Sequence, residues 1–410
     1  MSTLPKSAFD ITIKKLVKVR QIFPNVQLKS VRESVRNGIF QNRNIQTVQA
    51  GQRVAVLVGS RGISNLNHVV KSTVECLLEV GAKPFIVPAM GSHGGGIATM
   101  QKEIVEGYGI TEKYTGVPIV SSIETVVIGH TPEGIPIHVD KVASEADAIV
   151  PIARVKVHTD YDAPIESGLC KMLAIGLGKH NGCSRLHQEG FPQFPKLIPQ
   201  VASIIIQKMN IAFGAAIVEN AHENLHSIHI VPGKSFLEEE PALLSLSKSL
   251  MPKLQFDEID VLIVERMGKD ISGAGMDPNI IGRMSTGKIP NFNGPQIKRI
   301  LLLGISPNSH HNGTGCGLAD FITRQAFEQI DLTSTYTNCI ASGNPEAGKI
   351  PLIIENEKEG ILAAIQTCAQ IDPNDAKIVK IKDTLHLIDI QVSENLLDYC
   401  MNSNKFEVLP

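Results

Sequence analysis

The sequence predicts an α/β fold in two domains, with the active site in the cleft between them. Short apolar runs alternate with amphipathic, helix-like segments along the whole chain. The chain has 410 residues, which is long for a single domain. Loops rich in glycine, histidine and lysine follow the predicted strands, where α/β proteins usually bind their ligands.

The first half of the chain predicts one complete α/β domain. Buried strands are expected over residues 53–59, 83–91, 146–157 and 211–219, and helices over 66–81, 97–109, 197–210 and 235–254. The last of these helices is charged and leucine-rich, and it leads to the expected domain boundary near residue 255.

The alternation restarts after this boundary. Strands are expected over residues 259–268, 298–306 and 376–381, and helices over 318–330 and 357–370. We therefore predict a catalytic, cofactor-anchoring domain over 1–255 and a smaller domain over 256–391 that closes the cleft. The tail, 392–410, is expected to pack back on the first domain.

Composition excludes several classes of partner. The charges of the 39 basic and 41 acidic residues nearly cancel, and no run of like charge stands out in the sequence. Both features argue against nucleic acid or an anionic membrane as the main partner. No apolar run reaches the roughly 18–20 residues that span a bilayer, and the first residues lack a secretory signal core. Seven scattered cysteines indicate reduced thiols. The expected location is the cytoplasm.

The segment "MGSHGGGIATM" joins a predicted strand to a predicted helix. Its glycines, Gly94, Gly95 and Gly96, allow a ligand to approach the backbone closely, and His93 lies beside them. The alternative is an ordinary glycine turn with a solvated histidine.

Two further loops carry a cation directly after a strand. Arg61 in "GSRGIS" offers a fork of donors suited to a carboxylate or phosphate. Lys269 stands beside Asp270 in "MGKDISGAG". The alternatives are a surface arginine and a surface Lys–Asp pair, which is worth under about 1 kcal/mol.

The densest group of candidates comprises His158, Lys171, His180 and His187. Lys171 lies in the apolar run "GLCKMLAIGLG", where its charge must be desolvated or paired. Such a lysine is a plausible nucleophile or attachment point. Histidines suit a metal ligand or a general base, although a single histidine is more often structural.

Other histidines give weaker signals. His310 and His311 precede a glycine-rich helix entry, for which a polar turn is favoured over a metal site. His222, His226 and His229 have no fixed partner and predict a loop and strand edge.

Several of these positions together resemble the nickel-pincer lactate racemase family and its superfamily of 2-hydroxyacid racemases and epimerases. The matching positions, in order, are Arg61, His93, His158, Lys171, His187 and the run "GKDI" at Lys269. The resemblance implies a pyridinium-3,5-bisthiocarboxylic acid mononucleotide joined to Lys171 as a thioamide, with nickel held by this pincer and by His187. Acylation of Lys171 would remove its buried charge.

The resemblance also implies roles for the remaining positions. His93 and His158 would be two bases, one for each face of the substrate, in a hydride transfer that passes through a 2-oxo acid. Arg61 and Lys269 would hold the substrate carboxylate or polarise its oxygen, and Gly94–Gly96 would surround the cofactor or substrate. The implied partners are a 2-hydroxy acid and the enzymes that build the cofactor.

Three departures indicate a substrate other than lactate. Val58 stands where lactate-active members carry an aspartate, the segment before Lys171 reads "YDAPIESGLCK", and the chain has no tryptophan. A sugar acid or a dicarboxylate is the better candidate.

Two other functions stay open at this point. A zinc or iron ion held by His158, His180 and His187 could serve a lyase or a hydrolase. Alternatively, a non-catalytic protein could keep the cleft and bind a hydroxy acid or nucleotide without turnover.

Overall fold

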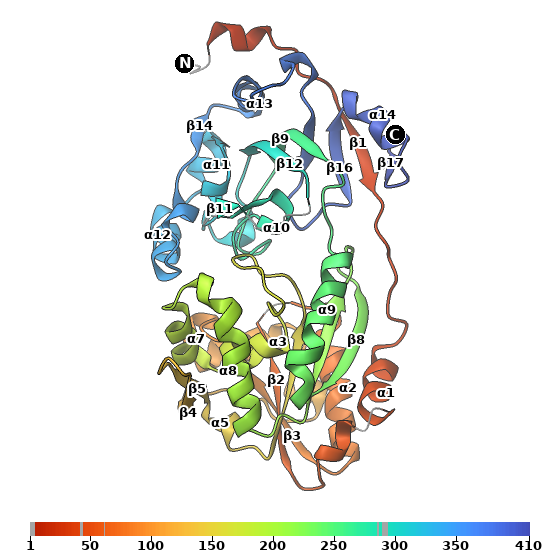
Figure 1. Cartoon of the computed structure of the whole chain (residues 1–410), viewed down its shortest axis with the longest axis vertical. Helices are drawn as coiled ribbons and strands as arrows, with labels where there is room; N and C mark the ends of the chain where they lie inside the picture. The colour runs from red at the N-terminus through yellow and green to blue at the C-terminus, as the bar shows by residue number, and fades with distance from the viewer. Residues whose placement is uncertain (1–4, 42–43, 61, 285–286, 289–293) are drawn as a thin grey trace. The chain divides into compact units, whose positions relative to one another are not determined.

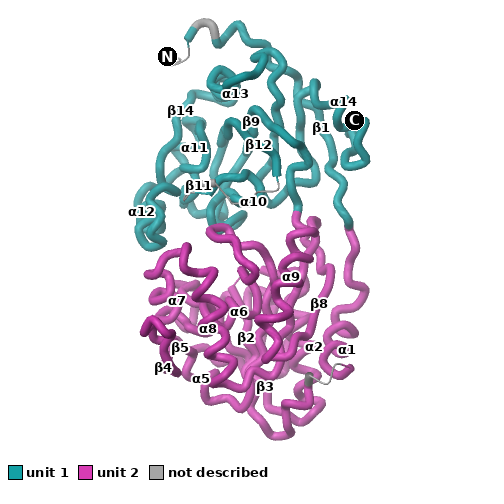
Figure 2. Tube along the Cα trace, in the orientation of Figure 1, with its two compact units in different colours: residues 1–24, 252–410 teal, residues 25–251 magenta. Residues whose placement is uncertain are grey.

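The computed structural model describes residues 5–41, 44–60, 62–284, 287–288 and 294–410. The chain forms two compact units, as predicted (Figure 2). Unit 2 comprises Asn25–Met251, and unit 1 comprises Met1–Pro24 together with Pro252–Pro410. Each unit is built around its own mixed sheet. The prediction of an α/β fold is confirmed.

Unit 2 contains a five-stranded sheet in the order β3-β2-β6-β7-β8 (Figure 1). The strands are β2 (Arg53–Val58), β3 (Lys83–Pro88), β6 (Ala148–Arg154), β7 (Phe213–Glu219) and β8 (Leu225–Pro232). The first four strands in this order are parallel, and β8 pairs antiparallel with β7 at the edge. The carboxyl ends of four strands therefore meet at one edge, where the candidate loops begin.

Both faces of this sheet are buried, so its strands are continuously apolar. Val54 and Val56 of β2 belong to the core that includes α1 (Val31–Gln41), α2 (Leu66–Glu79) and α3 (Ala98–Gly107). Ala55 and Leu57 point into the opposite core. That core includes α8 (Phe194–Lys208) and α9 (Phe236–Leu250).

A broken helical segment lies in the second of these cores. It consists of α6 (Leu169–Lys171), one π-helical turn (Met172–Gly176) and α7 (Lys179–His187). The hairpin of β4 (Thr125–His130) and β5 (Pro136–Asp140) packs against α7. Two short helices, α4 (Glu112–Thr115) and α5 (Lys141–Ser144), complete the unit.

Unit 1 contains an eight-stranded sheet in the order β14-β13-β12-β9-β15-β16-β1-β17. The strands are β1 (Leu16–Gln21), β9 (Glu258–Val264), β12 (Gln296–Leu302), β13 (Phe321–Thr323), β14 (Leu352–Ile354), β15 (Ile378–Ile381), β16 (Asp389–Ser393) and β17 (Phe406–Val408). The five strands from β14 to β15 are parallel, and the remaining three pair antiparallel. Its helices are α10 (Pro278–Ile281), α11 (Arg324–Glu328), α12 (Leu332–Ala341), α13 (Glu357–Gln366) and α14 (Leu397–Met401).

The two ends of the chain lie elsewhere than predicted. β1 pairs with both β16 and β17, so this strand belongs to the sheet of unit 1 and not to a domain over 1–255. The strand of the tail, β17, pairs with β1 in the same sheet, so the tail belongs to unit 1. Pairing between strands this far apart in the chain leaves no local pattern in the sequence. The helix expected over 318–330 was also wrong in part, because β13 occupies Phe321–Thr323 and α11 begins only at Arg324.

Candidate active site

The loop after β3 presents His93. Its glycines at 91, 94, 95 and 96 all have positive φ, between 59° and 66°, a conformation that other residues rarely adopt. Within this loop His93 is exposed, and its Nδ1 contacts the Ser60 hydroxyl in the loop after β2. The Tyr108 hydroxyl in turn donates to the Ser60 carbonyl. The ring of His93 is thus anchored by the neighbouring strand's loop.

The predicted glycine positions also pack closely against their surroundings. A Cβ on Gly96 would lie 3.2 Å from the His180 ring, and one on Gly94 would lie 3.3 Å from the backbone nitrogen of Gln101. These contacts account for glycine at both positions, while contact with a cofactor stays a prediction. Arg61 lies outside the described residues.

The broken helical segment carries both Lys171 and His187. Lys171 is half-buried at the end of α6, and His187 ends α7 in the same broken segment. The start of α6 is held by Glu240 of α9, whose Oε2 accepts from the Cys170 amide at 2.9 Å. Glu240 is 1% exposed, and its burial raises its pKa to about 7.

His187 is oriented as a metal-binding histidine would be. Its Nδ1 lies 2.7 Å from the Cys183 carbonyl oxygen, to which it donates, so the neutral ring has its lone pair on Nε2. Phe191 and Phe194 contact the ring edge-on, with centroids 5.6 and 5.0 Å away. Burial alone would lower the pKa of His187, but its contacts with Cys183 raise it.

His158 follows β6 and stacks on Tyr161, with ring centroids 4.4 Å apart. Its Nδ1 accepts from the Asp160 amide at 3.1 Å, so the neutral ring carries its proton on Nε2. The Asp160 carboxylate lies 3.6 Å from the same nitrogen. The His158 amide donates to the buried Glu166 carboxylate.

Three of the predicted histidines gather at one edge of the sheet. His158 and His187 both contact the ring of Phe191, at 5.7 and 5.6 Å between centroids. Ser92, which precedes His93, has its hydroxyl 3.7 Å from the Cys183 sulfur in the turn before His187. The loops after β2, β3 and β6 and the broken helix thus converge, with Lys171 near His187.

His180 does not join this group as a further ligand. It is exposed on α7 and lies against Gly96. Within the part of the chain that the structure describes, no three histidine, cysteine or carboxylate side chains are grouped to hold a metal ion. The alternative site of His158, His180 and His187 is therefore not formed.

Lys171 is half-buried, whereas Lys179 is the fully buried lysine of this segment. Lys179 is 0% exposed and pairs with Asp140, which is also fully buried, at 3.2 Å. Burial lowers the pKa of Lys179, and the Asp140 carboxylate opposes this shift. The sequence did contain a sign of this buried lysine, because Lys179 in "GLGKH" directly follows the apolar run that contains Lys171.

Lys269 lies in unit 1 in the loop after β9. Its Nζ donates to the Gly273 carbonyl at 2.7 Å, and the neighbouring Asp270 accepts from the Ser306 hydroxyl at 2.7 Å. Each of the two side chains thus has a bond within the loops of unit 1. His310 and His311 form a turn with positive φ, as the favoured interpretation predicted.

Sequence reasoning missed a second polar group in unit 1. Asp383, fully buried after β15, accepts from the His386 Nδ1 at 2.7 Å and from the Arg266 Nε at 3.0 Å. Arg266 follows β9 directly, so this group lies at the carboxyl edge of the parallel strands, near Lys269 in sequence.

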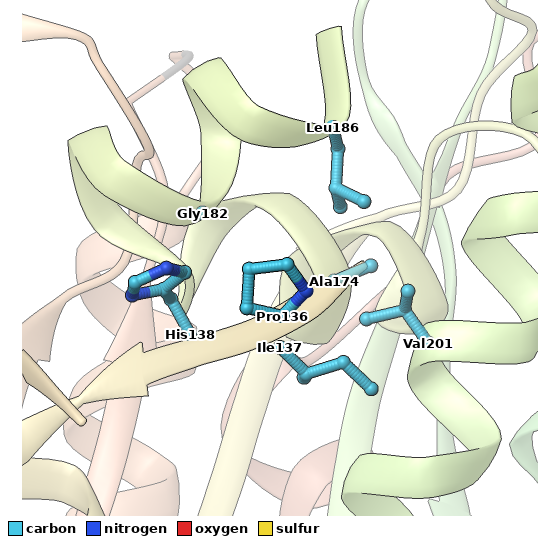
Figure 3. A pocket seen from close by; sticks show the side chains of 7 residues that line it. All are labelled: Pro136, Ile137, His138, Ala174, Gly182, Leu186 and Val201. Carbon is cyan, nitrogen blue, oxygen red and sulfur yellow. The ribbon is translucent and has the colours of Figure 1, made fainter. Parts of the chain in front are cut away.

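A small recess behind α7 is separate from these residues. Figure 3 shows its lining, which consists of Pro136, Ile137, His138, Ala174, Gly182, Leu186 and Val201. The walls are mostly apolar and leave no room for a water molecule. It is a packing gap between β5, α7 and α8 and carries no candidate residue.

Comparisons with known proteins agree with this description. Residues 6–193 match the family described as the lactate racemase N-terminal domain, which bears out the resemblance inferred from the sequence. None of the curated proteins matches the chain.

Two solved structures share the fold. A protein from Thermotoga maritima matches 90% of this chain and 99% of its own with a TM-score of 0.55 and 15% identity. The lactate racemase apoprotein from Thermoanaerobacterium thermosaccharolyticum matches 91% and 99%, with a TM-score of 0.52 and 13% identity. Among the described residues, no helix is both long and apolar enough to cross a membrane.

Proposed function

Residues 6–193 match the lactate racemase N-terminal domain family, and from this match we propose that the chain is a nickel-pincer racemase or epimerase of a 2-hydroxy acid. One observation carries the proposal. The Nδ1 of His187 is occupied by the Cys183 carbonyl, so that its Nε2 is the metal-binding atom, and Lys171 lies earlier in the same broken helical segment.

The described residues fit the proposed cofactor. The half-buried Lys171 would be the attachment point, and His187 Nε2 would be the protein ligand of nickel. When bound, such a cofactor supplies an acceptor for the hydride on the substrate's stereocentre. The Phe191 and Phe194 rings beside His187 would exclude water from this side.

The two flanking histidines differ in a way that suits a two-base reaction. The neutral His158 ring has its proton on Nε2, so it can donate a proton to a substrate oxygen. His93 is exposed and held through Nδ1 by Ser60, and we assign it the opposite role, that of taking the hydroxyl proton. The roles exchange when the reaction runs in reverse.

The substrate proposed is a larger or more polar hydroxy acid than lactate. Val58 is fully buried in the apolar core at the end of β2, so this position contributes no polar group to a ligand. Arg61 and Lys269 as carboxylate ligands remain part of the proposal, as do the cofactor-building enzymes as partners. Sugar acids and hydroxy dicarboxylates are the first compounds to screen.

The proposal is tested by intact-protein mass and metal analysis after co-expression with cofactor-building enzymes and supply of nickel. The wild type is expected to gain mass at Lys171 and to bind about one nickel per chain, the single site that the proposal assigns. Lys171→Ala should lose both, whereas His187→Ala should keep the added mass and lose nickel. Lys71→Ala, at a half-buried lysine on α2, is the matched control and should keep both.

Other outcomes would favour the alternatives. An unmodified Lys171 with zinc or iron would indicate a different metalloenzyme, and an unmodified, metal-free chain would indicate a binding protein. His93→Ala and His158→Ala should retain nickel and lose about 10²–10⁴-fold in turnover. Wild-type turnover in either variant would refute the two-base assignment.

A further inference from the structure

A buried polar network lies directly beneath the His93 loop. Gln101 of α3 is 0% exposed, and its Nε2 donates to two carbonyl oxygens of the loop, those of Gly91 and His93, each at 3.0 Å. Both amide hydrogens of this side chain are therefore used to hold the loop backbone. Since the loop's glycines permit many conformations, it needs such restraint.

The orientation of this amide is fixed by a cation. Lys179 Nζ lies 3.1 Å from Gln101 Oε1, 2.6 Å from the Pro88 carbonyl oxygen and 3.2 Å from Asp140 Oδ2. The ammonium group thus donates to two oxygens and forms an ion pair with a third, that of Asp140. Because the ammonium group requires an oxygen opposite it, the Gln101 NH₂ must face the loop carbonyls.

The network also joins the two halves of the proposed site. Lys179 begins α7, the helix that carries His187, and it holds this position with a φ of 51°. Asp140 ends β5 and is itself fixed by the Ala143 amide at 2.8 Å. One ion pair and a chain of hydrogen bonds therefore connect β5, through the start of α7, to the carbonyl of His93.

We propose that Gln101, oriented by Lys179 and Asp140, is a positioning residue that fixes His93 relative to the helix carrying Lys171 and His187. It touches no reacting atom and acts through the backbone of the His93 loop. The role in turnover rests on the proposed function, whereas the restraint of the loop does not.

Gln101→Met tests this, because it retains the length and the apolar packing of the side chain and removes all three hydrogen bonds. In the cofactor-free protein, hydrogen–deuterium exchange over residues 89–97 should accelerate at least about tenfold as the loop opens locally. Gln101→Glu keeps an acceptor for Lys179 but places a carboxylate oxygen against two carbonyls, and it should release the same segment. Val70→Ala, in the fully buried face of α2, controls for general loss of stability.

In the loaded enzyme, Gln101→Met should keep the added mass on Lys171 and the nickel, while kcat falls about 10- to 100-fold at an unchanged KM. Val70→Ala should leave kcat nearly unchanged. Unaltered exchange over 89–97 in both Gln101 variants, or a loss of kcat no larger than that of Val70→Ala, would overturn the assignment. If the wild type itself carries no cofactor, the proposed function fails, and the exchange data alone still decide whether Gln101 restrains the loop.

Discussion

Lys171 and Lys179 lie in one broken helical segment but differ in burial. Lys179 is fully buried and has three oxygen partners, so it stabilises the backbone around it. Lys171 is only half-buried and lies near His187. A lysine that must react needs access, and the structure gives that access to Lys171 and denies it to Lys179.

Glu240 predicts a specific dependence of stability on pH. Burial raises the pKa of this carboxyl from 4.5 to about 7 in the folded protein. As the pH rises, the Glu240 carboxyl ionises in the unfolded chain before it ionises in the folded protein. The stability that Glu240 contributes is therefore fully present below about pH 4.5 and is lost as the pH rises through about 7. The full loss corresponds to about 3 kcal/mol.

Glu240→Gln removes this titration and keeps an oxygen that can accept from the Cys170 amide. The decrease in urea midpoint between pH 5 and pH 8 should therefore be smaller in Glu240→Gln than in the wild type. Glu239→Gln, at an exposed position on the same helix, should retain the wild-type decrease. Equal decreases in all three proteins would show that Glu240 is already ionised at pH 5.

The sequence identified the reactive residue types of the site but not the residues that hold them. His93, His158 and His187 were candidates because of the segments that carry them, and the resemblance to a known family implied their roles. The structure brings the elements that carry them together. Gln101 and Glu240 were missed, since each is an ordinary polar residue within a helical pattern. Their partners lie far away in the chain, as with Glu240 and Cys170 at a separation of 70 residues.

Among the secondary-structure elements, the π-helical turn between α6 and α7 was not predicted from the sequence. It lies between Lys171 and α7, and such turns are frequent at functional sites. Gly176, its last residue, is buried against the strand that leads to His93. A Cβ there would lie 2.6 Å from the Ala89 carbonyl oxygen and 2.9 Å from the Met172 sulfur.

Gly176→Ala should therefore destabilise unit 2 by about 1–3 kcal/mol, because backbone atoms must move to accept the methyl group. Gly107→Ala is the matched control, since a Cβ at this last residue of α3 would meet nothing within 4 Å. The control should be neutral or stabilising by up to about 1 kcal/mol. Urea unfolding at one pH measures both, and equal stability of the two variants would contradict the close packing.

Across the whole molecule, strands and helices were predicted well where neighbouring residues in the sequence form a clear hydrophobic pattern. The strands around 53–58 and 258–264 are examples, because parallel strands buried on both faces form short apolar runs. The assignment of the first residues failed, since β1 gains its place only by pairing with β16 and β17 at the other end of the chain. The division into units thus depends on contacts that composition cannot show.

Val19 tests that division directly. It is 0% exposed in β1, opposite Ile390 of β16 and Val408 of β17. Val19→Ala should cost about 2 kcal/mol through the cavity it leaves. Hydrogen–deuterium exchange should then accelerate over residues 378–393 in unit 1, although the substitution lies near the start of the chain.

The same experiment distinguishes the observed units from a domain that runs from residue 1 to residue 255. Peptides from β2 and β6 should keep their wild-type exchange, because they belong to the other sheet. Val26→Ala, at a side chain that is 61% exposed, should leave both sets of peptides unchanged. Faster exchange in β2 and β6 with no change over 378–393 would place the first residues in unit 2. Faster exchange over 378–393 with no change in β2 and β6 would instead show that the second sheet depends on both ends of the chain. A protein shortened to begin at residue 25 would then lose unit 1 before it lost the residues around Lys171 and His187.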